Sequence, residues 1–267
     1  MRRLVIRPGA IGDFILSLPA IDRLRTGYFE IWARGPNVPL ARCAERTRAI
    51  EATGLDLLGI TGPDPWFIDE LRSFDSIVSW YGANRPEFRE LTASLDLPFI
   101  FLPALPPVGT GVHAVDFYLE QVRTLACRSS DGVPRIPCPA APGNFAVLHP
   151  FAASEGKRWP LERFRELAGV LERRMPVRWC AGPEDELPGA IRIPDLYELA
   201  CVLASARVFI GNDSGISHLA AAAGAPVVAL FGPTDPAVWA PRGPHVRVVA
   251  KTSMEAIEIE EVLAAIA

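Results

Sequence analysis

The sequence predicts an α/β protein made of two consecutive halves, each with a parallel sheet covered by helices. Short apolar runs, typical of buried strands, alternate with stretches of helical spacing along the 267 residues. This alternation stops once, at the proline-rich stretch Ser129–Gly143, and then starts again. Because strand–helix–strand units place their strands parallel, we expect two domains, residues 1–135 and 136–267, joined by this stretch.

Composition favours a globular protein that has no general attraction for nucleic acid. Hydrophobic residues make up 49% of the chain and charged residues 22%, and the formal net charge is −4. No apolar run reaches the roughly 20 residues that cross a bilayer, and we expect no signal peptide before the first strand. The five cysteines have no zinc-binding spacing, so we expect free, mostly buried thiols in a reducing compartment, the cytoplasm.

In the first half, apolar runs and helical spacing alternate from the first residues onward. The strands are expected at Arg3–Arg7, Phe29–Ala33, Ser76–Trp80 and Phe99–Leu102. The helices are expected at 11–25, Val38–Arg46, Ile68–Ser73, Arg85–Ser94 and His113–Cys127. Pro19 lies inside the first of these helices and removes a backbone hydrogen bond, so we expect a kink there.

The second half repeats the alternation after the linker. The strands are expected at Phe145–His149, Val177–Ala181, Val208–Ile210, Val227–Phe231 and Val246–Val249. The helices are expected at Pro160–Arg174, Leu196–Ser205, Gly215–Ala223 and Glu255–Ile266. Gly211 is expected to end the strand that begins at Val208.

Polar residues gather at the turn between the strand at Val208 and the helix at Gly215. Either Asp213 or Ser214 can cap this helix, and His218 lies one turn after Ser214 on the same face. In a parallel sheet this turn lies at the carboxyl edge, where ligands bind. The helix start offers free N–H groups and a positive dipole end, and Gly215 lets an anion approach the backbone. The turn therefore suits a phosphate; a capped helix with a structural histidine is the alternative.

Two more charged residues follow predicted strands. Asp13 comes directly after Gly12, where an aspartate acts either as a helix cap or as a functional carboxylate. Lys157 lies in the loop before Pro160, and it is one of only two lysines among the 27 basic residues. A lysine in a chain that otherwise uses arginine indicates a chemical requirement for a flexible ammonium; a solvated loop lysine is the alternative.

Several common site motifs are absent. The chain has no Gly-x-Gly-x-x-Gly, no phosphate-binding Walker loop and no Gly-x-Ser-x-Gly. It also has no Asp-x-Asp, and Glu184-Asp185-Glu186 is interpreted as a solvated loop. We therefore predict no cofactor and no bound metal.

Three motifs resemble glycosyltransferase family 9, the family of the lipopolysaccharide heptosyltransferases. They are Gly211-Asn-Asp-Ser-Gly-x-x-His-Leu-Ala-Ala-Ala222 with Pro226-Val-Val-Ala-Leu-Phe-Gly-Pro-Thr-Asp-Pro236, Arg7-x-Gly-Ala-x-Gly-Asp13 with Pro19-Ala-x-x-x-Leu-Arg25, and Lys157-x-Trp-Pro160. The resemblance implies the GT-B arrangement of two facing Rossmann-like domains. The first half is then expected to bind an acceptor, and the second a nucleotide sugar such as ADP-heptose.

The resemblance also implies roles for individual residues. Asp13 is the expected general base, and the turn that carries it, Gly9, Ala10 and Gly12, is expected to contact substrate. The departing diphosphate would be stabilised by Lys157, Ser214, Gly215 and His218, with Thr234 in reach. Asp213 is expected to hold a sugar hydroxyl, whereas Trp159 is expected to pack in the core.

The donor nucleotide is the point at which this chain departs from the family. The family commonly places an acidic residue, which holds the ribose, where this chain has Tyr197. The chain is also shorter than typical members, mainly between Gly182 and Asp195. Tyr197 can stack or donate one hydrogen bond, so we expect it to contact the nucleotide.

The expected function is an inverting, metal-independent sugar transfer in bacterial lipopolysaccharide biosynthesis. The acceptor hydroxyl belongs to a glycan, a lipid core or a protein, and the enzyme is cytoplasmic, with room for a peripheral contact with the inner membrane. Two alternatives remain at this point. A GT-B sugar-nucleotide epimerase would release an isomer without an acceptor, and a non-catalytic nucleotide-sugar-binding protein would bind without turnover.

Overall fold

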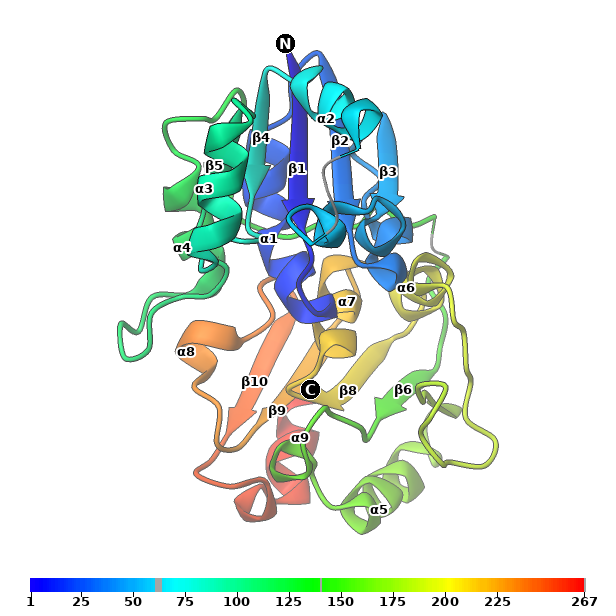
Figure 1. Cartoon of the computed structure of the whole chain (residues 1–267). Helices are drawn as coiled ribbons and strands as arrows, with labels where there is room; N and C mark the ends of the chain where they lie inside the picture. The colour runs from blue at the N-terminus through cyan, green and yellow to red at the C-terminus, as the bar shows by residue number, and fades with distance from the viewer. Residues whose placement is uncertain (61–63, 140, 267) are drawn as a thin grey trace. The chain divides into compact units, whose positions relative to one another are not determined.

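The computed structural model describes residues 1–60, 64–139 and 141–266, and its contacts divide the chain into two units. Unit 1 comprises Met1–Ala10 and Ser17–Gly132, and unit 2 comprises Ile11–Leu16 and Val133–Ala267. Each unit is built on one five-stranded parallel sheet (Figure 1). The predicted α/β class with Rossmann-like parallel sheets is therefore confirmed.

The sheet of unit 1 has the strand order β3-β2-β1-β4-β5. Its strands are β1 (Arg2–Arg7), β2 (Tyr28–Ala33), β3 (Arg46–Ala49), β4 (Ser76–Ser79) and β5 (Phe99–Phe101). The α-helices in this part of the chain are α1 (Ile11–Arg23), α2 (Pro65–Arg72), α3 (Pro86–Ser94) and α4 (Ala114–Gln121). Three 3-10 helices, η1 (Gly35–Leu40), η2 (Ile50–Ala52) and η3 (Leu55–Leu57), lie between β2 and α2.

The apolar run of β1 explains its central place in this sheet. Leu4, Val5 and Ile6 have no exposed surface. Leu4 and Ile6 belong to a cluster that also contains Phe67 of α2 and Phe88 of α3, whereas Val5 points to the opposite face because side chains alternate along a strand. A strand that is apolar on both faces is stable only when both faces are covered, and burying each such side chain contributes about 1.5–3 kcal/mol.

The sheet of unit 2 has the strand order β10-β9-β8-β6-β7. Its strands are β6 (Ala146–His149), β7 (Val177–Trp179), β8 (Val208–Asn212), β9 (Val227–Phe231) and β10 (Val246–Ala250). The α-helices are α5 (Leu161–Leu171), α6 (Leu196–Ala204), α7 (Gly215–Ala222), α8 (Pro236–Trp239) and α9 (Ile259–Ile266). The 3-10 helices η4 (Glu155–Lys157) and η5 (Met254–Ala256) precede α5 and α9.

Side chains alternate between the two faces of the sheet along the strands of unit 2, and helices pack on both faces. Leu148, Ile210 and Leu230, from three neighbouring strands, share one core cluster with Phe164 of α5 and Val262 of α9. Helices α6 and α7 pack against each other, and α7 packs on β8 and β9. The sheet thus lies between helices, as the alternation of strands and helices predicted.

The segment Val38–Arg46 is a correction to the sequence-based prediction, because it is not an α-helix. It contains the end of the 3-10 helix η1 and leads to the edge strand β3. Pro39 inside the segment has no N–H to donate to an α-helical bond. The strand Arg46-Thr-Arg-Ala49 lacks an apolar alternation; the Arg48 guanidinium instead lies 4.4 Å from the centre of the Trp32 ring.

Other boundaries differ by smaller amounts. Gly211 does not end its strand, because it pairs with His149 and Ala229 and β8 continues to Asn212. Helix α4 ends at Gln121, before the predicted Cys127, and α1 continues through Pro19 to Arg23. Helix α9 begins at Ile259, after η5, instead of at Glu255.

Two further expectations concern the thiols and the membrane. All five cysteines are free thiols, but only Cys180 is buried, and Cys127 is exposed. Within the described residues, none of the helices combines the length and the apolar character that crossing a bilayer requires.

Candidate functional site

Each sheet reverses its strand order at one place, and the polar motifs follow the strands on either side of it. In unit 1 the order reverses between β1 and β4, and the motif Pro8–Asp13 follows β1. In unit 2 it reverses between β6 and β8; the loop with Lys157 follows β6, and Asp213 and Ser214 follow β8. Such switch points at carboxyl edges are where open parallel sheets bind ligands.

The turn between β8 and α7 is held by its own hydroxyl groups. Ser214, not Asp213, is the N-cap of α7, and its Oγ accepts a hydrogen bond from the backbone N of Ser217 at 3.5 Å. The Ser217 hydroxyl, which is fully buried, donates to the backbone oxygen of Asn212 at 2.5 Å. This cap leaves other N–H groups of the first turn for an anion, and phosphate binding there stays a prediction.

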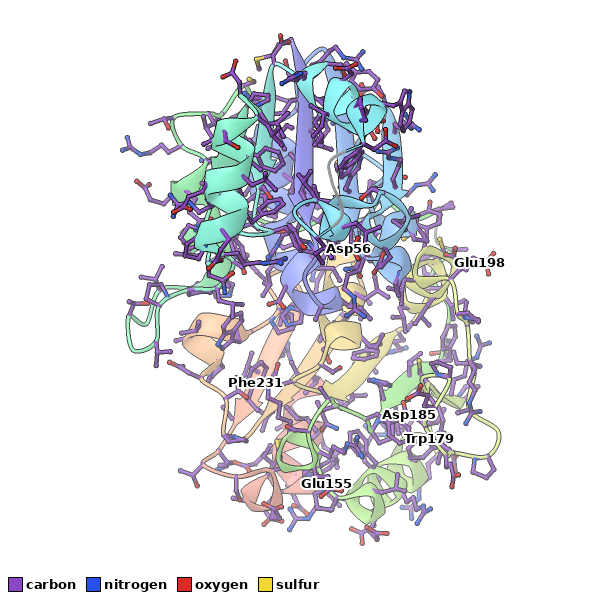
Figure 2. All side chains as sticks on the ribbon, viewed as in Figure 1. Asp56, Glu155, Trp179, Asp185, Glu198 and Phe231 are labelled. Atoms are coloured by element: carbon purple, nitrogen blue, oxygen red, sulfur yellow. The ribbon has the colours of Figure 1, made fainter. Side chains whose placement is uncertain are left out.

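Lys157 and Asp213 meet although 56 residues separate them in sequence. The Nζ of Lys157 donates to Oδ2 of Asp213 at 2.7 Å; Asp213 is 8% exposed and Lys157 34%. An ammonium carries three donors, so Lys157 can hold Asp213 and an anionic ligand at the same time. The loop that carries Lys157 begins its 3-10 turn at Glu155, which is labelled in Figure 2 together with Phe231, the last residue of β9.

The first residues of α1 belong to unit 2, where they pack against the start of α7. A Cβ built on Gly12 would lie 3.0 Å from Cδ2 of His218, and a Cβ built on Gly215 would lie 2.7 Å from the Cβ of Ile11. Both glycines are therefore required by close packing of these two segments. Packing against Ile11 is a reason for Gly215 that the sequence analysis did not give, and room for an anion stays a prediction. His218 is buried beside the segment that carries Asp13.

Asp13 is not a helix cap, which removes one of its two interpretations. Ala10 is the N-cap of α1 and makes no side-chain capping bond, while Asp13 lies in the first turn. A carboxylate in the first turn lies near the positive end of the helix dipole, and this interaction is favourable. Gly9, the neighbouring predicted contact, accepts a hydrogen bond at its backbone oxygen from the buried Asn37 amide at 2.9 Å.

Tyr197 and Thr234, the two remaining residues that are predicted to contact substrate, both lie in unit 2. Tyr197, in the first turn of α6, donates its hydroxyl to the backbone oxygen of Pro137 at 3.2 Å. Asp195 caps the same helix. Thr234 is half-buried in the turn between β9 and α8, next to Asp235, which caps α8. Contact of either residue with a nucleotide stays a prediction.

Two side chains were not singled out by the sequence analysis. The Asn212 amide is fully buried, and it accepts from the backbone N of Trp159 at 3.1 Å and donates to the backbone oxygen of Pro150 at 2.9 Å. His149, at the end of β6, lies with Nδ1 3.0 Å from the backbone oxygen of Cys180, and its burial lowers its pKa. Each is the last residue of its strand, at the carboxyl edge, and this position is the signal that could have identified them from the sequence.

Trp159 packs in the core, as expected. It is 1% exposed, lies edge-on to Phe164, and donates its indole N–H to the backbone oxygen of Ile257 at 3.0 Å. Among the described residues no group of three or more His, Cys, Asp or Glu is placed to share a metal ion. Asp185, from the acidic triplet, instead accepts a hydrogen bond from the backbone N of Gly182 at 2.8 Å.

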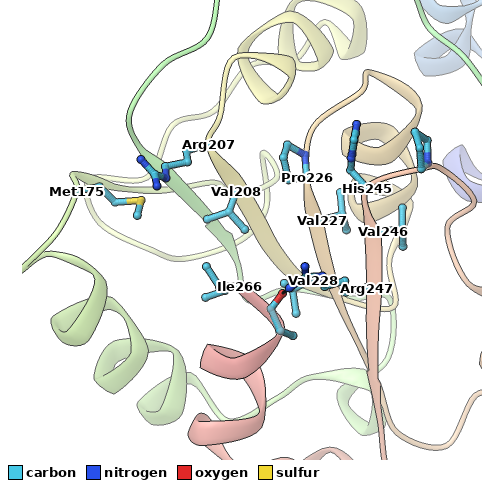
Figure 3. Close-up of a pocket in the computed structure, with 12 residues that line it drawn as sticks. Met175, Arg207, Val208, Pro226, Val227, Val228, His245, Val246, Arg247 and Ile266 are labelled. Carbon is cyan, nitrogen blue, oxygen red and sulfur yellow. Dashed lines mark hydrogen bonds between the residues drawn. The ribbon is translucent and has the colours of Figure 1, made fainter.

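A pocket of about 270 Å³ lies elsewhere in unit 2 (Figure 3). It is lined by residues at the amino ends of β8, β9 and β10, including Val208, Val227 and Val246, together with Met175 and Ile266. This is the opposite edge of the sheet from Lys157 and Asp213, and none of the predicted site residues lines it. The candidate site is therefore the carboxyl edge and not this pocket.

Two solved heptosyltransferases from E. coli are similar to this chain in fold. The E. coli heptosyltransferase WaaC with ADP aligns with a TM-score of 0.75 and 19% identity, over 99% of this chain and 98% of that one. The E. coli ADP-heptose lps heptosyltransferase II aligns with a TM-score of 0.72 and 18% identity, over 100% and 98% of the two chains. These likenesses confirm the predicted GT-B fold class.

Sequence comparison identifies relatives of the same kind. Lipopolysaccharide heptosyltransferase 1 of Escherichia coli K12 is 34% identical over 111 residues, which is 37% of this chain and 35% of that protein. Its counterpart from Pseudomonas aeruginosa is 32% identical over 184 residues, which is 58% of this chain and 48% of that protein. The chain thus spans about a third to a half of the length of these relatives.

A family model matches a longer stretch that includes the central motif. The model of glycosyltransferase family 9 (heptosyltransferase) covers residues 116–264, from α4 to the last helix. This range contains Lys157 and Asp213, which pair at the carboxyl edge of unit 2, and also Ser214 and His218 at the start of α7. Because the match extends over more than half of the chain, this protein belongs to glycosyltransferase family 9.

Proposed function

We propose that this protein is an inverting, metal-independent glycosyltransferase that moves a heptose from ADP-heptose to a hydroxyl of the lipopolysaccharide core. The observation that carries the proposal is the pairing of Lys157 with Asp213 at 2.7 Å, beside the capped start of α7. Relatives named lipopolysaccharide heptosyltransferases, 30–34% identical over parts of the chain, support the sugar and the acceptor. A WaaC structure that holds ADP-2-deoxy-2-fluoro heptose supports the donor.

The donor diphosphate binds in unit 2, where a lysine and a helix start provide positive charge and N–H donors. Lys157 supplies a full charge, and the first turn of α7 supplies N–H donors and the positive dipole end. Asp213 holds Lys157 in place and, with its second oxygen, accepts a hydrogen bond from a sugar hydroxyl. His218, Gly215 and Thr234 complete the contacts of the diphosphate, and Tyr197 contacts the nucleoside.

The transfer step uses Asp13 as general base. The carboxylate of Asp13 takes the proton of the acceptor hydroxyl, and the acceptor oxygen forms a bond with the anomeric carbon as the bond from that carbon to the phosphate oxygen breaks. The ADP that leaves carries the negative charge, which Lys157 and the start of α7 stabilise. One displacement at the anomeric carbon inverts its configuration.

The two halves divide these tasks. Residues 1–135 form the domain that binds the acceptor, with Gly9, Ala10 and Gly12 near the reacting hydroxyl, and residues 136–267 form the domain that binds the donor. An acceptor built on a lipid favours work at the cytoplasmic face of the inner membrane, with the protein in peripheral contact with it.

The direct test is turnover followed by mass spectrometry. ADP-heptose is mixed with lipopolysaccharide from a bacterial strain that lacks core heptose, and the expected product is heavier by one heptose. A heptose isomer formed without acceptor would make the protein an epimerase, and donor binding without any product would make it a binding protein. Either result contradicts the proposal.

Metal independence has its own test. We expect product formation to continue at an unchanged rate in excess EDTA, because Lys157 and a helix start serve as the partners of the diphosphate. Loss of activity in EDTA that magnesium restores would contradict this part of the proposal.

A further inference from the structure

We propose that Asn212 is the positioning residue of this site: it fixes the loop that carries Lys157, and so fixes the ammonium that binds the diphosphate. The inference rests on the role proposed for Lys157. Asn212 would act on ligand binding through two hydrogen bonds that it makes to the protein backbone.

The contacts of Asn212 join both ends of one loop. The loop follows β6 and extends from Pro150 to Trp159, with Lys157 two residues before its end. At its first residue the backbone oxygen of Pro150 accepts from the Asn212 amide at 2.9 Å, and at its last residue the backbone N of Trp159 donates to the Asn212 amide oxygen at 3.1 Å. The Asn212 side chain therefore joins the first and last residues of the loop, and within the loop the Arg158 side chain donates to the backbone oxygen of Ala152 at 2.9 Å.

Only an amide of this length meets both requirements. The Asn212 side chain must donate at one atom and accept at the next, and it has no exposed surface, so water does not replace it. A carboxylate lacks the donor, and an aliphatic side chain lacks both groups. Either change leaves a buried backbone group of Pro150 or Trp159 unsatisfied, and the loop has to move to recover it.

Asp213 and the Trp159 ring are fixed by contacts that do not involve the Asn212 side chain. Loss of that side chain is therefore expected to free the loop between them. Asp213 is fixed to the neighbouring strand, because its backbone N donates to Leu230 at 2.9 Å. The Trp159 ring is fixed through Phe164 and Ile257. Between these fixed points, Lys157 is 34% exposed and reaches Asp213 only through the placement of its loop.

The proposal predicts a coupling between Asn212 and Lys157 in nucleotide binding. We expect Asn212→Leu to weaken ADP binding, measured by calorimetry, by about tenfold. In a protein that already carries Lys157→Met, the same change is expected to alter the affinity by less than about twofold, because the ammonium that Asn212 positions is gone. Equal losses in both backgrounds, or no loss in either, would overturn the proposal.

Two further variants separate positioning from general damage. Asn212→Ser removes both bonds but leaves a small polar side chain and room for water, so it serves if Asn212→Leu does not fold; the same coupling is expected. Leu171→Ala opens the core at α5, 3% exposed and outside the loop, and is expected to lower the melting temperature without changing ADP affinity. A matching loss of affinity in Leu171→Ala would assign the effect of Asn212 to stability.

Hydrogen exchange of the ligand-free protein tests the placement without any nucleotide. The Trp159 amide and the segment 151–159 are expected to exchange at least about tenfold faster in Asn212→Leu than in the unaltered chain. Unchanged exchange there would overturn the proposal whatever the affinity data show. If the unaltered chain does not bind ADP, the function proposed for the site fails, while the exchange experiment still decides whether Asn212 holds the loop.

Discussion

The turn between β1 and α1 and the turn between β8 and α7 occupy equivalent places in their sheets but are built differently. The second is capped by its own serine, Ser214, and is joined by a lysine from another loop. The first has Ala10 at the cap, with no side-chain capping bond, and a carboxylate, Asp13, in the opening turn of its helix.

The difference matches the roles proposed for the two turns: the β8–α7 turn binds the diphosphate, and the β1–α1 turn supplies the general base. At the start of α7 the Lys157 ammonium is paired with Asp213 but keeps further N–H donors, and with the capped helix start it suits a diphosphate. The start of α1 carries a carboxylate, Asp13, which suits an anion less well but is the kind of group that accepts a proton from a hydroxyl. Substitutions in the β1–α1 turn are therefore expected to lower turnover, and substitutions at the β8–α7 turn are expected to weaken nucleotide binding.

Removal of the Asp13 charge is expected to have the largest effect. We expect Asp13→Asn to lower turnover by at least about a hundredfold, the size of a general-base contribution, while ADP affinity stays unchanged. Asp22→Asn on the same helix, which loses a surface ion pair with Arg25, is the matched control and is expected to turn over normally. Near-normal turnover in Asp13→Asn would exclude this residue as the base.

Removal of the Lys157 charge is expected to act on binding. We expect Lys157→Met to weaken ADP binding by about 1.5–3 kcal/mol, the range for a hydrogen bond to a charged group. The other lysine, Lys251, pairs with Glu261 at 2.7 Å and is similarly exposed, so Lys251→Met is the matched control. Calorimetry in which both variants bind ADP equally well would place Lys157 outside the site.

The choice of nucleotide base is expected to have a smaller effect, because the roles proposed for the two turns concern the diphosphate and the acceptor hydroxyl and not the base. Phosphate is common to ADP, UDP and GDP, and the Tyr197 side chain has a single donor, which the structure shows donating to the backbone oxygen of Pro137. We expect ADP to bind best, but within about tenfold, or roughly 1.4 kcal/mol, of the other two. A thermal-shift series at matched concentrations measures this, and a clear preference for UDP or GDP would contradict ADP-heptose as donor.

Exchange of the two caps is expected to have the smallest effect. Ser214→Ala is expected to cost about 1 kcal/mol of stability through the lost cap, whereas Ala10→Ser is expected to add a smaller amount at the uncapped turn. Thermal unfolding of the two variants measures both changes. If the two substitutions change the stability by the same amount and in the same direction, the two turns do not differ in capping.

Local chemistry made the β8–α7 turn predictable from the sequence. The apolar runs Val208–Ile210 and Val227–Phe231, with Ser214 and Gly224 at the two ends of the helix between them, specify strand, cap and helix over a few residues. The same local signals were ambiguous for Asp13, because an aspartate after a glycine suits a cap and a first turn equally well. Where proline and arginine replaced apolar alternation, before β3, local reasoning gave the wrong element.

Contacts between distant segments are decided only by the tertiary structure. The sequence alone determined two sets of parallel αβ units, the carboxyl-edge position of the motifs and the identity of their charged residues, because each of these depends on neighbours along the chain. The pairing of Lys157 with Asp213, the closure of the loop by Asn212 and the packing of Gly12 against His218 depend on the strand order that brings β6 beside β8 and on the placement of the first turn of α1. A side chain's partners in these cases lie tens of residues or more away, and only packing of the sheet and its helices selects them.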